Sequence, residues 1–445
     1  MQGEPRARAD ERWGPVRTSL VGVLMLALVG AGLWLVGSRD GSPGTAGAGP
    51  SVTPSLTAAP TPTVDPSVLR LQAVDQLMAA RSDAMMRRDR TAWLATVDAE
   101  SAEFAQRQAA VFDNLDAVPL AEWRYEYAGD GPSLSAERLA ELGPDAWVAR
   151  AVLVYRLEGA ETGEVRREQY LTLVRRGEQW LIAGDTDGGS APDLWDLGPV
   201  QVVRGERSLV LGTAPAHELE RHAEETDQAA SRVDAVWGSD WPRTVVVMVP
   251  QSQAEMAKLL LRLDETGLDQ IAAVTTGEVG VDTAGTSADR VVINPAGFAQ
   301  LGPLGRQVVL THEITHVATR ATTTQDVPIW LSEGFADYIA YKQTGVSRPV
   351  IAQDVLDRVR ADQGPTQLPT GPDFDPGRGD IAPAYAGAWL AAELIARRWG
   401  EGTLVGLYRA VSSGTPTSEA LPAAIGLSEE QFTGEWLAYL EELAS

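Results

Sequence analysis

Hydrophobic and polar positions divide the chain into an apolar span, an uncharged linker and two folded units. Residues 18–37 carry no charge and include the run LVGVLMLALVGAGLWLV, about 20 residues in all, which is the length needed to cross a membrane. Four arginines lie within residues 1–17, and only Arg39 follows the span closely. The positive-inside rule therefore predicts a single-pass membrane anchor with residues 1–17 in the cytoplasm and the rest outside the cell membrane.

A cleaved signal peptide is the alternative for this span. Its length and the position of Trp34 near the outer end favour an uncleaved anchor. Residues 38–66 then form a linker, because the part from Gly41 to Val64 contains no charge and consists mainly of Gly, Ser, Thr, Ala and Pro. Such a composition cannot bury a core and predicts a flexible spacer.

Residues 67–190 form the first predicted folded unit. A helix is expected from the spacing of Leu71, Val74 and Met78, and a second amphipathic stretch covers residues 91–111. Strands follow, and they are indicated by alternation around residues 123–127, by the runs 148–157 and 169–174, and by a hairpin that turns at Gly177.

Two helices followed by a curved antiparallel sheet make an α+β cone, whose last strands, RRGEQWLIAGD, resemble the nuclear-transport-factor-2-like fold. That fold hosts enzymes, ligand binders and spacers, so the resemblance implies no activity, although it is compatible with a homodimer through this module. Asp185 and Asp187 are read as a solvated loop rather than a cation site.

The second predicted unit, residues 197–445, combines a small mixed sheet with C-terminal helices. Apolar runs at 245–249 and 291–293 predict strands, residues 304–320 have helical character, and the pattern after Trp330 is almost wholly helical. The fold class of the whole chain is therefore α+β.

The chemical signal is concentrated in the segment His312-Glu313-Ile314-Thr315-His316, in a chain with only four histidines. On a helix, residues four apart lie about 40° from each other on one face. Both imidazoles can therefore bind one zinc ion, with Glu313 beside them as a general base for a water molecule.

A catalytic zinc site usually has three protein ligands, so a third is needed. Glu333 follows His316 by 17 residues, which leaves room for a loop at 321–326 and a second helix beginning near Pro328. Asp337 lies one turn after Glu333 and is placed to accept the distal N–H of a ligating histidine.

HEITH followed by WLSEGFADY resembles the gluzincin metallopeptidases, the thermolysin-like and M1-aminopeptidase-like group, and most of all the bacterial peptidase-MA-like domains. The resemblance implies Zn²⁺ bound by His312, His316 and Glu333, Glu313 as the general base, and Asp337 as the residue that orients a histidine. It implies hydrolysis of peptide bonds by an activated water. The sequence has no GxMxN-type stretch, which binds the free amino end of M1 substrates. This departure from the family weakens the aminopeptidase interpretation and leaves endopeptidase activity or a narrow specificity open.

Peptide hydrolysis also needs a donor for the oxyanion besides the metal. The resemblance implies a downstream tyrosine or histidine in this role, and no histidine follows His316, so a tyrosine is expected. Tyr385, which begins an expected amphipathic helix 52 residues after Glu333, resembles the family's tyrosine in placement. Tyr338 and Tyr341 are the alternatives, although both are expected to pack against their own helix.

Composition and charge argue against several other kinds of function and binding site. The chain holds 61 acidic and 37 basic residues, a net charge of −24, which disfavours binding to nucleic acid. It contains no cysteine, which excludes disulfides and thiolate metal sites. His217 and His222 lie about 140° apart on a helix, so they should not bind one metal ion together. The segment HELERH is therefore expected to be a solvated helix. Residues 373–380, DFDPGRGD, are read as a polar turn rather than a cation-binding or substrate-rim loop.

The sequence therefore predicts a membrane-anchored extracytoplasmic zinc peptidase that acts on a peptide or protein substrate. The alternative is a non-catalytic metal-binding surface protein with a binding or regulatory role, in which a structural site would be closed by four ligands. Another metal-assisted hydrolysis is a third reading, because the site alone does not name the bond that is cleaved.

Overall fold

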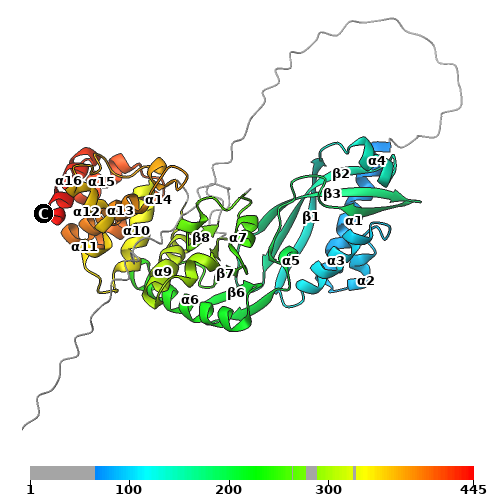
Figure 1. The fold of residues 1–445 in the computed structure, drawn as a ribbon, viewed down its shortest axis with the longest axis horizontal. Helices are drawn as coiled ribbons and strands as arrows, with labels where there is room; N and C mark the ends of the chain where they lie inside the picture. Colours follow the sequence, from blue (N-terminus) through cyan, green and yellow to red (C-terminus); the bar gives the residue numbers. More distant parts are fainter. Residues whose placement is uncertain (1–65, 263, 277–287, 324–326) are drawn as a thin grey trace, which may run out of the picture. The chain divides into compact units, whose positions relative to one another are not determined.

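The computed structural model describes residues 66–262, 264–276, 288–323 and 327–445, which form two compact units (Figure 1). Residues 66–201 belong to the first unit, and Val202–Thr276 with Asp289–Ser445 form the second. The predicted cytoplasmic segment, the anchor at 18–37 and the linker up to residue 65 lie outside the described residues. Within the described ranges, no helix is both long and apolar enough to cross a membrane.

A four-stranded antiparallel sheet is the framework of the first unit (Figure 1). Its strands are neighbours in chain order, namely β1 (Leu120–Asp130), β2 (Trp147–Leu157), β3 (Val165–Arg176) and β4 (Gln179–Gly184). The predicted hairpin is confirmed, since Arg176 pairs with Gln179 and Gly177 adopts the left-handed conformation, φ 62°, that its turn requires.

Helices α1 and α3 contact this sheet. The helices of the unit are α1 (Pro66–Met86), α2 (Arg90–Leu94), α3 (Ala102–Asn114), α4 (Ala136–Leu142) and α5 (Leu194–Leu197). The helix expected at Leu71 is confirmed, but the single stretch expected over 91–111 is wrong. Helix α2 ends at Leu94. Val97 then forms a β-bridge with Ile182 of β4, and the N–H of Asp98 donates to the Ile182 carbonyl at 2.8 Å.

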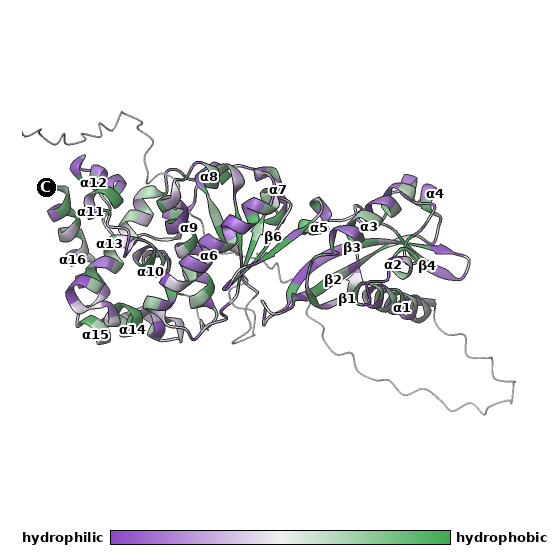
Figure 2. Cartoon of the chain, turned by 90° about the horizontal axis from the view of Figure 1, so that it is seen from below, coloured by the Kyte–Doolittle hydropathy of each residue, from purple (hydrophilic) through white to green (hydrophobic). Residues whose placement is uncertain are grey.

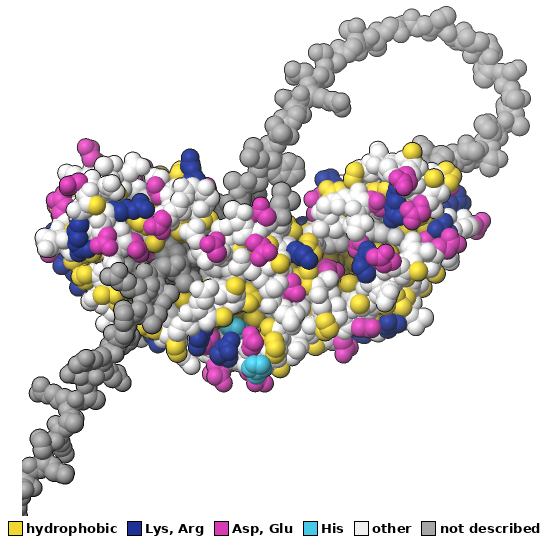
Figure 3. Space-filling model, viewed as in Figure 1, with side chains coloured by type: hydrophobic (Ala, Val, Ile, Leu, Met, Phe, Trp, Pro, Cys, Tyr) yellow, Lys and Arg dark blue, Asp and Glu magenta, His cyan; other side chains and the backbone are white. Residues whose placement is uncertain are grey.

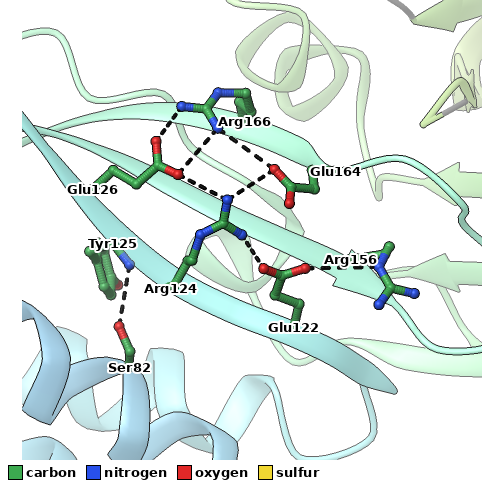
Figure 4. A network of polar contacts seen from close by, with 8 residues as sticks. All are labelled: Ser82, Glu122, Arg124, Tyr125, Glu126, Arg156, Glu164 and Arg166. Atoms are coloured by element: carbon green, nitrogen blue, oxygen red, sulfur yellow. Dashed lines mark hydrogen bonds and ion pairs between the residues drawn. The ribbon is translucent and has the colours of Figure 1, made fainter. Parts of the chain in front are cut away.

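The side chains of β1 divide between two environments. The ring of Trp123 is buried in the interior, whereas Arg124 lies in a network of charges with Glu122, Glu126 and Glu164 (Figure 4). Arg166 of β3 joins the same network through Glu126. Exposed ion pairs each contribute at most about 1 kcal/mol, so their main effect is to make this surface polar and internally neutralised.

The two aspartates of the loop after β4 are each engaged with a different arginine. Asp185 pairs with Arg107 at 2.8 Å, and Asp187 pairs with Arg138 at 3.2 Å. Each carboxylate is thus neutralised by an arginine from another segment of the unit.

A five-stranded mixed sheet opens the second unit, and Figure 2 shows its strands as mainly hydrophobic. The order is β5-β6-β7-β9-β8, with β5 (Gln201–Arg204), β6 (Ser208–Gly212), β7 (Val245–Val249), β8 (Ala273–Thr276) and β9 (Arg290–Ile293). Strands β6, β7 and β9 are parallel, and β8 runs antiparallel to β9 at the end of the sheet. Every residue of β7 is buried, as expected for a central parallel strand, and both predicted strands are confirmed.

Helices make up the rest of this unit. They are α6 (Ala216–Trp237), α7 (Gln253–Leu259), α8 (Pro295–Ala299), α9 (Pro303–Arg320), α10 (Ile329–Tyr341), α11 (Arg348–Ile351), α12 (Gln353–Arg360), α13 (Ala382–Trp399), α14 (Glu401–Ser412), α15 (Thr417–Ile425) and α16 (Glu429–Ala444), with short 3₁₀ turns η1 (Leu268–Gln270) and η2 (Gly371–Phe374). On the face of the molecule in Figure 3, acidic and basic side chains are interspersed.

Helix α13 is buried on all sides from Ala382 to Ile395, so the expectation of an amphipathic helix is wrong. It contacts α10, α12, α14 and α16, which leave it no solvent face over this length. Gly334 permits the approach of α10, because a Cβ atom there would lie 2.3 Å from the carbonyl oxygen of Ala388. The two helices that carry Glu333 and Tyr385 are thus packed backbone to backbone.

His222 corrects the expectation of a solvated HELERH helix. His217 is exposed, but His222 is only 2% exposed and packs against the ring of Phe298, with 5.0 Å between ring centroids. Burial lowers its pKa to about 4, and the neighbouring charges of Arg221 and Arg306 act in the same direction. The sequence could not show this, because the burial comes from contacts made after the helix packs.

We predict that His222 makes this unit less stable in mild acid. Between its ordinary pKa of 6.5 and its folded value of about 4, the unfolded chain binds a proton that the folded chain excludes. Stability should therefore fall as the pH drops through this window, by roughly 3 kcal/mol in total. Urea unfolding followed through hydrogen exchange of α6 peptides should show this slope. His222→Leu should flatten it and His217→Leu should preserve it, whereas an unchanged slope in His222→Leu would contradict the assignment.

Candidate metal centre

Helix α9 carries the HExxH segment through the core, where every residue from Val308 to Thr319 is buried. A buried helix tolerates polar side chains only where their hydrogen bonds are satisfied. Thr311, Thr315 and Thr319 meet this condition by donating to the backbone carbonyl four residues earlier, at 2.7, 2.7 and 2.9 Å.

Three predicted ligands converge from two helices. On α9, His312 and His316 bring their Nε2 atoms to 3.0 Å from each other. Glu333 of α10 places its Oε2 atom 3.2 Å from Nε2 of His312 and 3.4 Å from Nε2 of His316. All three side chains are buried, and among the described residues this is the one group of His, Cys, Asp or Glu whose ligand atoms could hold a metal ion.

The spacing of these atoms fits a tetrahedral metal ion. An ion about 2.0–2.2 Å from its nitrogen and oxygen ligands separates neighbouring ligands by about 3.3–3.6 Å. The observed separations of 3.0, 3.2 and 3.4 Å are close to this edge length. Two imidazole nitrogens and one carboxylate oxygen are also a donor set that zinc accepts in catalytic sites.

Asp337 lies one turn after Glu333 and accepts from the other nitrogen of His312, with 2.8 Å between Oδ1 and Nδ1. A proton on Nδ1 leaves the Nε2 lone pair of His312 facing the other two ligand atoms. Asp337 thus contacts the nitrogen of His312 that does not face the other two ligand atoms.

Burial sets the electrostatics of this centre. It penalises the charged form of Glu333, but His316 and His312 outweigh that penalty and hold the pKa of Glu333 well below its usual value. Burial lowers the pKa of His316, whereas Asp337 and Glu333 overcome burial and raise the pKa of His312. The cluster is thus arranged to balance carboxylates with positive charge, which a divalent cation would supply.

Glu313 lies beside the ligands without joining them. One oxygen, Oε2, accepts from the hydroxyl of Thr275 at 2.6 Å, whereas Oε1 is buried and has no hydrogen-bond partner among the described residues. Burial raises the pKa of Glu313 to about 7, and His312 and Thr275 oppose that rise. A buried carboxylate oxygen without a partner is costly, which marks a place for a water molecule or a ligand.

The three candidate tyrosines occupy different places. The ring of Tyr385 is 6.1 Å from that of His312 and is held edge-on by Phe374 at 4.8 Å. The hydroxyl of Tyr338 instead donates to Glu401 at 2.8 Å, and the ring of Tyr341 packs against Trp389. Of the three, Tyr385 is the one whose ring lies against a ligand histidine, His312.

The segment DFDPGRGD forms turns, as predicted. Asp373 caps η2 together with Thr370, Asp375 accepts from the N–H of Gly377, and Asp380 accepts from the N–H of Ala382. These carboxylates are thus used by the local backbone. A cavity of about 590 Å³ opens beside the turns, lined among others by residues of α12, α13 and α16.

Thr275 is the residue of the site that sequence reasoning missed. It lies on the short strand β8, 38 residues before Glu313, and belongs to no motif with it. A threonine in an apolar segment carries no signal for this contact, which arises only when β8 packs against α9.

Comparisons with known proteins give distant matches. No protein-family model and no curated protein matches this sequence. Among solved structures, the M1 zinc metallopeptidase from Deinococcus radiodurans is 15% identical with a TM-score of 0.30, covering 59% of this chain and 58% of that chain. A mutant of it bound to a Tyr-Ser-Ala substrate is 16% identical with a TM-score of 0.30, covering 65% and 60%. The match thus spans about three fifths of the length of those structures.

We predict that the full chain, purified in detergent, binds about one zinc ion. His316→Ala and Glu333→Ala should each lose it or bind it far more weakly, because each removes a ligand atom. Metal analysis by mass spectrometry after dialysis against a zinc buffer measures this directly. His217→Ala removes an exposed histidine and is the control. A folded wild-type chain without zinc, or equal zinc in all variants, would contradict the site.

Proposed function

We propose that this protein is a zinc-dependent peptidase. The observation that carries the proposal is the buried His–His–Glu group with zinc-like spacing, next to a glutamate that has one oxygen without a partner in the described part of the chain. A metal site and a base side by side in a dry core are what hydrolysis by an activated water requires. The distant similarity to M1 zinc metallopeptidases is compatible with this reading.

The ligand count favours an enzyme over a structural metal site. Structural zinc sites are closed by four protein ligands, whereas catalytic sites keep one position open. Within the described residues, no fourth His, Cys, Asp or Glu joins the ligand group, and Asp337 is occupied by His312. This observation weighs against the alternative of a non-catalytic metal-binding protein.

The chemistry divides between the ion and the side chains. A zinc ion held by His312, His316 and Glu333 would supply a Lewis acid that acidifies water and polarises a carbonyl group. Glu313 takes a proton from the attacking water through Oε1, and the water oxygen bonds to the carbonyl carbon. As the C–N bond breaks, Glu313 returns that proton to the leaving amine, so it ends the cycle as a carboxylate.

Tyr385 is proposed as the donor for the oxyanion that forms during this attack. Its ring is 2% exposed and stands between His312 and Phe374, so its orientation is fixed by packing. It lies in the first turn of α13, and the direct packing of that helix on α10 links its position to that of Glu333. A fixed donor needs little reorganisation during the reaction.

We propose that residues 18–37 anchor the chain in the cell membrane and that residues 38–66 hold the folded units outside. The substrate is proposed to be a peptide or protein. The first unit is proposed to act as a spacer or a homodimer contact, and the charge network around Arg124 would make a contact through that part of the sheet polar.

Glu313→Gln tests the proposed function. It should lower kcat on a quenched fluorescent peptide library by about 10²- to 10⁴-fold, because an amide cannot act as the base. Zinc content and the circular dichroism spectrum should stay unchanged. Glu220→Gln changes an exposed glutamate of α6 and is the matched control. Equal turnover in wild type and Glu313→Gln would exclude Glu313 as the base, and a zinc-loaded wild type without turnover would favour the non-catalytic alternative.

Tyr385→Phe should lower kcat by about 10²- to 10³-fold with little change in KM, because the lost hydroxyl acts on the oxyanion rather than on the bound substrate. Steady-state kinetics on one cleaved peptide measure both constants. Tyr341→Phe removes a hydroxyl from a tyrosine that packs against Trp389 and should retain wild-type kcat. A comparable loss in both variants, or no loss in Tyr385→Phe, would assign the oxyanion contact elsewhere.

A further inference from the structure

The strand β8 contributes one polar side chain to the metal centre. Thr275 is fully buried, and its hydroxyl lies 2.6 Å from Oε2 of Glu313 and 3.0 Å from the backbone carbonyl of the same residue. A hydroxyl has a single hydrogen, and the shorter contact to the charged acceptor is the stronger one. Thr275 therefore donates to the glutamate proposed as the base.

The strand itself is fixed with respect to α9. Thr275 pairs with Val291 of β9 in an antiparallel register, and its carbonyl accepts from Nη1 of Arg320, in the last turn of α9, at 3.5 Å. Alternation along the strand sends the next side chain the other way, where Thr276 donates to the carbonyl of Arg290 at 3.3 Å. The hydroxyl of Thr275 thus lies at the metal centre, and the hydroxyl of Thr276 points away from it.

This arrangement makes the two oxygens of Glu313 unequal. Oε2 is held by Thr275, and Oε1 has no partner among the described residues. The terminal torsion of a glutamate is soft, so a carboxylate without an anchor samples many orientations. Anchoring one oxygen leaves the other at a defined direction, ready to accept the proton of a water molecule.

We propose that Thr275 is a positioning residue for Glu313, an inference that rests on the proposed peptidase function. It is not one of the possible metal ligands. Its hydroxyl fixes which carboxylate oxygen acts as the base and where that oxygen points. A misplacement of about 1 Å in a reacting group costs on the order of 10²-fold in rate, so the loss of this anchor should be visible in kcat.

The test compares three variants of the full chain loaded with zinc. Thr275→Val keeps the shape of the side chain and removes the hydroxyl, Thr275→Ser keeps the hydroxyl, and Thr276→Val is the matched change one position along the same strand. Thr275→Val should lower kcat by about 10- to 100-fold with KM and zinc content unchanged. Thr275→Ser should recover most of the activity, and Thr276→Val should match wild type.

A second readout does not depend on turnover. A peptide hydroxamate carries a hydroxyl that can donate to the proposed base carboxylate, so its affinity should report the orientation of Glu313. Calorimetry should show weaker hydroxamate binding to Thr275→Val, by a factor of the same order as the kcat loss, and wild-type binding to the other two variants.

The outcomes separate the two proposals. Wild-type kcat and hydroxamate affinity in Thr275→Val, or equal losses in Thr275→Val and Thr276→Val, would overturn the positioning role while leaving the peptidase function intact. A wild-type chain that binds zinc but neither cleaves peptides nor binds the hydroxamate would overturn the proposed function, and the positioning role with it.

Discussion

The second unit is organised around the cost of burying ionisable groups. Five of them, His312, Glu313, His316, Glu333 and Asp337, lie in a helical core with at most 7% of each residue exposed. An isolated charge in such a place is strongly unfavourable, so each group needs a partner nearby. The carboxylates of Glu333 and Asp337 meet imidazole nitrogens, and a divalent cation between the three ligand atoms would balance the remaining charge.

The surrounding structure keeps that cluster dry and rigid. The threonine hydroxyls of α9 donate to backbone carbonyls of their own helix, so they need no hydrogen-bond partner among the side chains of the metal site. The close contact at Gly334 joins α10 to α13, so Glu333 and Tyr385 move as parts of one packed pair of helices. On the other side, β8 presents Thr275 to Glu313. Helices therefore supply the ligands, and a strand supplies the anchor of the proposed base.

Sequence reasoning succeeded where the chemistry is local and failed where it depends on packing. The spacing of His312 and His316 and the one-turn offset from Glu333 to Asp337 follow from helix geometry alone, and the strands at 245–249 and 291–293 follow from unbroken apolar runs. The break at Val97 and the burial of His222 depend on contacts with distant segments. The enclosure of α13 had the same cause, since an alanine-rich helix can fill a core without showing a strong polar face.

The division of the ligands between two helices has a consequence for the order of folding. His312 and His316 meet as soon as α9 forms, whereas Glu333 arrives only when the chain closes a loop of 17 residues. Closing such a loop costs about 2–3 kcal/mol of chain entropy, on a logarithmic scale of loop length. A metal ion held by all three residues would offset that cost, because energy gained on binding is also gained on folding. Metal binding would therefore stabilise the docked pair of helices whether or not a substrate is present.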